Sequence, residues 1–158
     1  MRTIARSTLL LSVSVLLSSF TAAQVNAPAR WQQVDLIQPA ALAVRISDPK
    51  ASKPVIFQVG FLELYRANHI PGALFAGPGS STAGLEALKR AVANIPKDRE
   101  IVIYCACCPW TACPNVRPAF DLLRNMGYTR VKALMVATNL QEEWVDKHYP
   151  METGVTEK

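Results

Sequence analysis

The chain is predicted to form an α/β fold in which a parallel sheet is covered by helices on both faces. Short apolar stretches rich in β-branched residues alternate with longer segments of helical periodicity between residues 38 and 148. Strands that alternate with helices pair in parallel, and strands buried on both faces are apolar throughout. Loops at the carboxyl ends of such strands are where open α/β sheets place their functional residues.

The first half of this region predicts two helices and two strands. Residues 38–46 carry a proline in their first turn and are expected to form a short helix. Residues 54–59 are apolar and β-branched, as in a buried strand. A second short helix over 61–67 precedes the turn His69-Ile-Pro-Gly-Ala73, which leads into a brief strand ending at Phe75.

The next helix and strand lead to the centre of the sequence. Three hydroxyl residues at 80–82 can cap a helix that runs to about residue 94, with Glu86 placed to close a capping box. Residues 100–104 then form a second buried strand, apolar after its first residue.

The last third predicts two helices around one strand. Asn115 can cap a helix that runs through Met126, with Gly127 as its stop. Residues 130–135 are expected to form a third buried strand, and residues 140–148 a final amphipathic helix.

The N-terminus is predicted to be a secretory signal. Arg2 and Arg6 form a basic region, residues 9–20 are apolar, and small residues follow at 21–23. The apolar stretch is too short to span a bilayer as a helix, although an uncleaved anchor is the alternative. We therefore expect a periplasmic or secreted protein. The predicted organisation is a signal peptide over 1–23, an N-terminal extension over 24–36, a domain over 37–151 and a C-terminal tail over 152–158.

Charge argues against nucleic acid as a partner. Without Arg2 and Arg6 the chain keeps 15 basic side chains against 12 acidic ones, a net charge of +3. The basic residues are scattered and show no cluster with interleaved aromatic residues. No further membrane-length segment follows the signal, so we expect no membrane partner after cleavage.

All four cysteines lie within nine residues, at Cys105, Cys107, Cys108 and Cys113. None of them can link distant parts of the fold. A cysteine at a strand end, followed by a loop and a helix N-terminus, has N–H groups nearby that stabilise a thiolate and lower its pKa. Cys105 holds that position and is predicted to be a nucleophile; a buried structural thiol is the alternative.

Two patterns in the sequence together resemble the rhodanese domain family. The first comprises residues 55–60, Tyr65 and the turn 69–73. The second comprises residues 101–105, 119–128, 131–134 and Trp144. The resemblance covers nearly the whole of 37–151. It implies the rhodanese-like fold, a parallel five-stranded sheet with helices on both faces, and it implies that Cys105 is the cysteine that carries a persulfide.

This sequence departs from the family pattern at two places. The family's first strand usually ends in Asp-Val-Arg, where this chain has Gln58, Val59 and Gly60. The loop after Cys105 is several residues longer than usual, and its first arginine is Arg117. The loop resembles that of an exported subgroup with a Cys-x-Cys-Cys-Pro-Trp core.

The three other cysteines have three possible roles. Cys107 or Cys108 could form a disulfide with Cys113 that rigidifies the loop. One of the three could instead resolve the Cys105 persulfide or sulfenate by closing an internal disulfide. The third role is a metal site, for which adjacent cysteines suit a zinc cage poorly, although soft Cu(I) is less demanding. We therefore expect redox or disulfide use, with no resident metal or cofactor.

Two further residues in the loop are candidates for substrate binding. Trp110 could cover the thiol or pack the loop down. Arg117 stands at a helix start, where a cation is unfavourable, so it could bind an anionic sulfur donor or simply be solvated. His69 is expected to fix its turn rather than act as a base.

The function predicted from these features is sulfurtransfer through a persulfide on Cys105, coupled to redox chemistry in the loop. The partners would be a small sulfur donor (thiosulfate, a polysulfide or a persulfide) and a thiol acceptor. The alternative is a non-catalytic rhodanese-like module that binds a partner or a soft metal through the cysteine loop.

Overall fold

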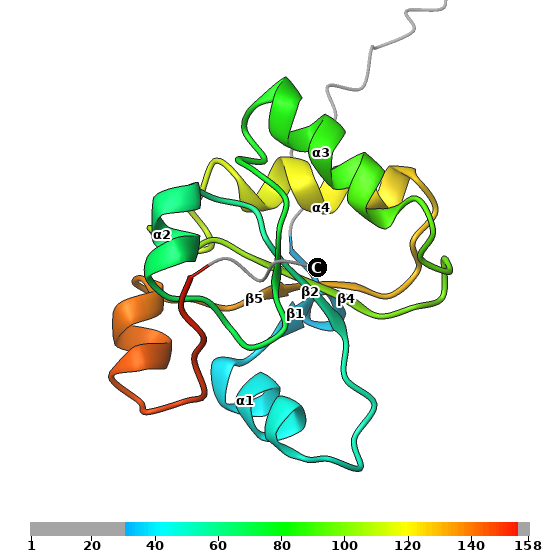
Figure 1. Ribbon diagram of the computed structural model, residues 1–158. Coiled ribbons are helices and arrows are strands. Elements are labelled where there is room, and N and C mark those ends of the chain that lie inside the picture. The colour runs from blue at the N-terminus through cyan, green and yellow to red at the C-terminus, as the bar shows by residue number, and fades with distance from the viewer. Residues whose placement is uncertain (1–30, 155–158) are drawn as a thin grey trace, which may run out of the picture. The chain divides into compact units, whose positions relative to one another are not determined.

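The computed structural model describes residues 31–154, which Figure 1 shows as a coloured ribbon. The predicted signal peptide, residues 24–30 and residues 155–158 lie outside the described residues. Within the described part, no helix combines the length and apolarity that crossing a membrane requires.

The described residues build a five-stranded sheet that is parallel throughout, as predicted. Its order is β1-β5-β4-β2-β3, so β4 lies between β5 and β2. All four residues of β4 are buried, which explains their uninterrupted apolar character. The strands are β1 (Leu36–Ile37), β2 (Val55–Gln58), β3 (Leu74–Phe75), β4 (Ile101–Tyr104) and β5 (Val131–Leu134).

Helices cover both faces of this sheet (Figure 1). Side chains of β4 alternate between two cores: Ile103 packs with α3 and α4, whereas Val102 packs with α1. Hydrophobic burial on both faces thus fixes β4 as the rigid centre of the domain. The helices are α1 (Pro39–Ser47), α2 (Leu62–Ala67), α3 (Thr82–Val92) and α4 (Val116–Asn125).

Three local expectations differ from the structure. The expected helix over 140–148 is a short π-helical turn, η2 (Gln141–Val145), which buries Trp144 so that its indole N–H donates to the Pro150 carbonyl at 2.8 Å. Glu86 closes no capping box, because the helix is capped by Ser81, whose Oγ accepts from the Gly84 N–H at 3.0 Å, and Glu86 lies too far along the helix. The apolar pattern did not predict β1, because a strand of two residues is too short to show a periodicity.

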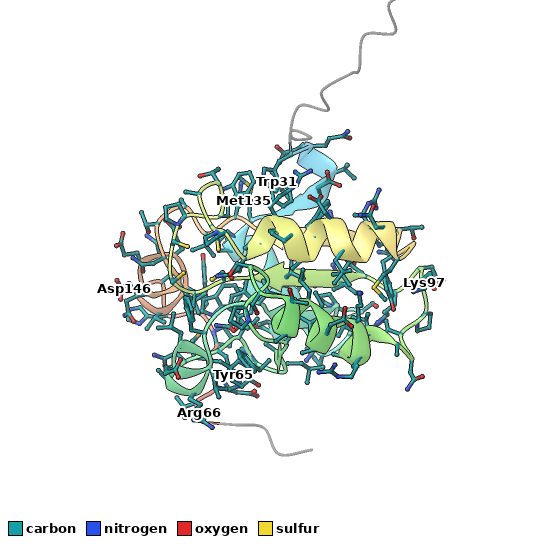
Figure 2. All side chains as sticks on the ribbon, turned by 90° about the horizontal axis from the view of Figure 1, so that it is seen from above. Trp31, Tyr65, Arg66, Lys97, Met135 and Asp146 are labelled. Carbon is teal, nitrogen blue, oxygen red and sulfur yellow. The ribbon has the colours of Figure 1, made fainter. Side chains whose placement is uncertain are left out.

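Residues ahead of β1 also pack on the domain. A 3-10 turn, η1 (Gln33–Asp35), leads into β1. The Trp31 ring, labelled in Figure 2, lies edge-on against Phe120 of α4 with centroids 4.8 Å apart. Lys132 of β5 donates to the Val34 carbonyl at 3.0 Å.

The turn that begins at His69 is held as predicted. His69 is buried, its Nδ1 lies 2.9 Å from the Tyr65 carbonyl, and its ring stacks on Tyr65. The Tyr104 hydroxyl accepts a hydrogen bond from the Ile70 N–H at 3.2 Å. These bonds tie the turn to the last residue of β4, directly before the cysteine loop.

Candidate active site

Cys105 follows the last residue of β4 and is 2% exposed. The Val59 N–H donates to the Tyr104 carbonyl at 2.8 Å, so the backbone just after β2 is bound to the end of β4. The candidate nucleophile therefore stands directly after the central, fully buried strand, at the carboxyl end of the parallel strands.

At Gly60, where the chain departs from the family pattern, there is no room for a larger side chain. A Cβ atom at Gly60 would lie 2.8 Å from the Cys105 Sγ, closer than real contacts allow. The buried Gln58 holds this backbone, because its Oε1 accepts from the Gly60 N–H at 3.1 Å. The space beside Gly60 is thus filled by the Cys105 sulfur.

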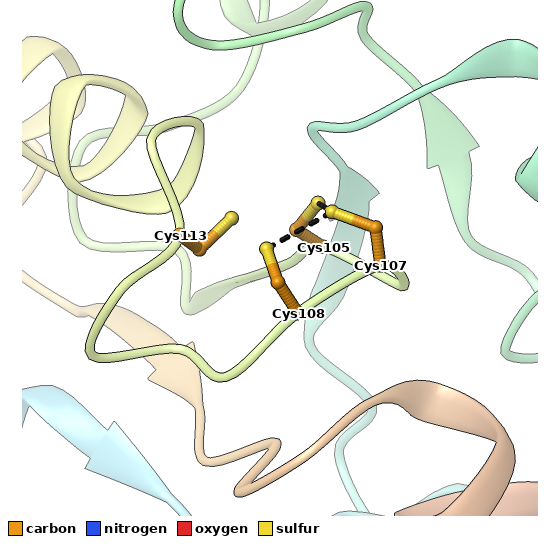
Figure 3. Close-up of side chains that lie close together, drawn as sticks. All are labelled: Cys105, Cys107, Cys108 and Cys113. Atoms are coloured by element: carbon orange, nitrogen blue, oxygen red, sulfur yellow. Dashed lines mark hydrogen bonds between the residues drawn. The ribbon is translucent and has the colours of Figure 1, made fainter.

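The four cysteine sulfurs converge at the end of β4 (Figure 3). All four lie within 4.8 Å of one another, and all are free thiols. Sγ of Cys107 is 3.4 Å from Sγ of Cys105 and 3.0 Å from Sγ of Cys108. The structure therefore brings together the four predicted cysteines, while their disulfide pairing stays a prediction.

Burial divides these cysteines into two pairs. Cys105 and Cys113, which we name the inner pair, are buried. Cys107, which is exposed, and Cys108, which is partly exposed, form the outer pair. A reagent from solvent thus meets Cys107 first, and Cys107 touches Cys105.

The N–H groups at the start of α4 act on Cys113 rather than on Cys105. A hydrogen bond from Cys105, followed by the backbone N–H groups of Asn115 and Val116, lowers the pKa of Cys113 to about 5. That hydrogen bond to Cys113, together with burial, raises the pKa of Cys105. The expectation that the helix start lowers the Cys105 pKa is therefore wrong, because the long loop places Cys113 there instead. The loop's own Cys107 N–H does lower the pKa of Cys105, but it is outweighed.

Burial, together with the neighbouring thiols Cys107 and Cys113, raises the pKa of Cys108 to about 12. The pKa values of the inner pair are thus shifted in opposite directions, upward for Cys105 and downward for Cys113.

Asn115 has a different role from the predicted helix cap. Its side chain makes no capping hydrogen bond to α4. Instead its Oδ1 accepts from the Ser80 N–H at 3.1 Å and from the Ser80 Oγ at 2.8 Å. The remaining amide group, Nδ2, lies 3.6 Å from the Cys105 Sγ and donates to it. Ser80 thus orients the Asn115 amide toward the candidate nucleophile.

The loop that carries the outer pair is anchored by backbone hydrogen bonds. The Trp110 N–H donates to the Val136 carbonyl at 2.9 Å, and the Leu140 N–H to the Ala106 carbonyl at 3.1 Å. The Trp110 ring meets the Trp31 ring edge-on, with centroids 5.3 Å apart. These contacts support the interpretation that Trp110 packs the loop down.

Arg117 is already paired. Its Nε donates to Asp121 at 2.9 Å, and its guanidinium lies 4.8 Å from the centroid of the Trp31 ring. A role for Arg117 in binding an anionic donor stays a prediction, and it would require the ion pair with Asp121 to be shared.

Comparison with known proteins places this geometry in a family. Residues 39–136 match the family model of the rhodanese-like domain. The comparison with curated proteins found no match.

Solved structures share the fold at low identity. The BH2092 protein from Bacillus halodurans is 22% identical, with a TM-score of 0.59 over 76% of this chain and 77% of that one. The Alr3790 protein from Anabaena sp. is 24% identical, with a TM-score of 0.56 over 77% and 94%. Thiosulfate sulfurtransferase from Pseudomonas aeruginosa is 20% identical, with a TM-score of 0.53 over 78% of this chain but 21% of that one. These likenesses show the fold, and the family match spans more than half of the sequence. The chain belongs to the rhodanese-like domain family.

Proposed function

We propose that the protein transfers sulfane sulfur through a persulfide on Cys105. The observation that carries the proposal is the position of Cys105: it ends the central strand of a rhodanese-like domain, with a thiol and an amide aimed at its sulfur. The sulfurtransferase among the fold neighbours shares the fold at 20% identity, so the chemistry proposed here rests on the site itself.

The first step is nucleophilic attack on a sulfur donor. With thiosulfate, Cys105 first gives up its proton to water or buffer, which reaches the site on the side of the exposed Cys107, and its thiolate is the nucleophile. The Cys105 sulfur then attacks the outer sulfur of thiosulfate, so that one S–S bond forms while another breaks and sulfite leaves. No external oxidant or reductant is needed. The Asn115 amide, whose Nδ2 lies 3.6 Å from the Cys105 Sγ, stabilises the Cys105 thiolate that attacks the donor.

The second step passes the sulfur outward. Cys105 is buried, whereas Cys107 is exposed and its sulfur is 3.4 Å away. An external acceptor thiol that attacks the terminal sulfur takes it as a new persulfide. When Cys107 instead attacks the Cys105 sulfur, a disulfide closes and hydrosulfide leaves, so the cycle then needs an external dithiol to reduce the loop.

Intact mass of the reduced protein after incubation with thiosulfate or a polysulfide tests this function. We expect one added sulfur atom in the wild type and in Cys108→Ser, and none in Cys105→Ser. In Cys107→Ser the persulfide should form and persist, because its nearest internal attacker is gone. Sulfur added to Cys105→Ser would refute the assignment, and a wild type whose mass never changes would favour the non-catalytic binding module.

We also propose that the protein acts outside the cytoplasm, as the N-terminal signal suggests. The test is N-terminal sequencing of the protein from its own cells. The sequencing is done on separated periplasmic, membrane and cytoplasmic fractions. A sequence that begins at Gln24 supports export with cleavage, one that begins at residue 1 in the membrane fraction supports an uncleaved anchor, and one that begins at residue 1 in the cytoplasmic fraction contradicts export.

A further inference from the structure

We propose that the reduced cysteine loop binds one Cu(I) ion through two or three of the sulfurs of Cys105, Cys107, Cys108 and Cys113. Among residues 31–154, these four side chains are the only group of at least three His, Cys, Asp or Glu residues placed close enough to share an ion. The inference rests on the geometry of the cluster and does not depend on the proposed sulfur transfer.

The ligand atoms favour a soft ion. The group consists of sulfur alone, with no imidazole or carboxylate in it. Thiolate ligands select Cu(I), zinc or iron–sulfur clusters, whereas oxygen ligands suit magnesium and calcium. An ion such as Mg²⁺ or Ca²⁺ therefore has no suitable partner here.

The number of sulfurs that must be brought into place favours Cu(I) over zinc. Zn–S bonds of about 2.3 Å in a tetrahedron require all four sulfurs about 3.8 Å apart. The sulfurs of the adjacent Cys107 and Cys108 are 3.0 Å apart, and those of Cys105 and Cys107 are 3.4 Å apart, so these sulfurs must separate when they bind an ion. A soft Cu(I) ion can be held by two or three of the four sulfurs, so fewer of them have to move within a loop that is fixed at both ends.

The site is both supported and open. Cys105 is fixed by β4, and Cys113 lies three residues before the start of α4. Hydrogen bonds of Trp110 and Ala106 hold the loop between them. The exposed Cys107 offers an entry, so an ion captured by the outer pair can be passed to the buried inner pair.

Titration of the protein with Cu(I), without oxygen and with a phosphine reductant, tests the site. The readouts are competition with a coloured Cu(I) chelator such as bicinchoninate, and native mass spectrometry for stoichiometry. We expect one Cu(I) per chain, with sulfur as the only scatterer type in the first shell of the X-ray absorption spectrum. Binding should release protons as thiols become ligands.

Variants sharpen this test. The double variant Cys107→Ser/Cys108→Ser removes the outer pair at partly exposed positions and should weaken Cu(I) binding at least about tenfold. Met135→Leu is the control, because its sulfur contacts Gln38 at 3.3 Å, and affinity should be unchanged.

Three results would overturn the site: no Cu(I) retained against the chelator, displacement of Cu(I) by equimolar Zn²⁺, or full affinity in the double variant. The titration contains no sulfur donor, so its outcome is separate from that of the sulfur-loading test. A protein that binds Cu(I) but loads no sulfur supports this site and contradicts the proposed function.

Discussion

The two ends of strand β4 bury different reactive groups with different partners. Glu100, just before the strand, is 4% exposed, and Cys105, just after it, is 2% exposed. The Glu100 carboxylate accepts two hydrogen bonds from Arg45, at 2.7 and 2.8 Å, and one from Arg130 at 3.1 Å. Cys105 is contacted by thiols and by the neutral amide of Asn115.

This difference in partners sets the protonation state at each end. The hydrogen bond from Arg45 is the main cause that lowers the pKa of Glu100, and burial opposes it only in part. The hydrogen bond to Cys113, together with burial, raises the pKa of Cys105. Two arginines therefore keep Glu100 ionised at neutral pH, whereas burial among thiols favours the protonated form of Cys105. Equal burial yields a structural ion pair at one end and a reactive centre at the other.

Gly60→Ala should disturb the Cys105 end most. The new Cβ would lie 2.8 Å from the Cys105 sulfur, which must rotate within a packed site. We expect a loss of about 1–3 kcal/mol in the free energy of unfolding, measured by urea denaturation, together with slower sulfur loading.

A double-mutant cycle identifies the cause of that loss. In a Cys105→Ala background the sulfur is absent, so the added methyl group should cost much less. An equal cost in both backgrounds would mean that the strain lies in the backbone of residue 60 and not against the nucleophile.

Asn115→Ala should have the next largest effect. It removes two hydrogen bonds to Ser80 and the amide that faces Cys105. Because Ser80 is exposed, water can replace its lost partner, and we expect about 1–2 kcal/mol of lost stability. Loading of Cys105 with sulfur should slow, because the attacking Cys105 thiolate loses a hydrogen-bond donor.

Ser80→Ala is the matched control, since it leaves the Asn115 amide in place with one orienting bond fewer. It should cost less stability and retain more of the loading rate. A Ser80→Ala protein that loads as slowly as Asn115→Ala would show that orientation of the amide, rather than its presence, is what Cys105 requires.

The sequence predicted the fold and the place of the nucleophile because both depend on local patterns. The apolar residues of β4 identify it as a strand without reference to any other segment, and Cys105 follows it directly. Proximity of the four thiols also follows from their nine-residue span.

The sequence could not predict contacts between distant segments. The local sequence predicted Asn115 as a helix cap, but its side chain accepts a hydrogen bond from Ser80, which is 35 residues away in the chain. Gly60 and Cys105 meet only because β2 and β4 are adjacent in the sheet. Which member of the inner pair has the lower pKa depends on which sulfur lies at the start of α4. The path of the loop determines this, and it cannot be predicted from the sequence.

Glu100→Gln should affect stability alone and by the smallest amount. The folded protein holds the pKa of Glu100 below its ordinary value near 4.5, so the ion pair stabilises fully above that pH and is lost as the pH falls through the lowered pKa. At neutral pH we expect about 1 kcal/mol of lost stability, because the Arg130 side chain is exposed and water screens its share. The deficit relative to wild type should shrink in acid-denaturation curves below about pH 4. Sulfur loading at Cys105 should be unchanged, and a Glu100→Gln protein that loads slowly would break the proposed separation between the two ends of β4.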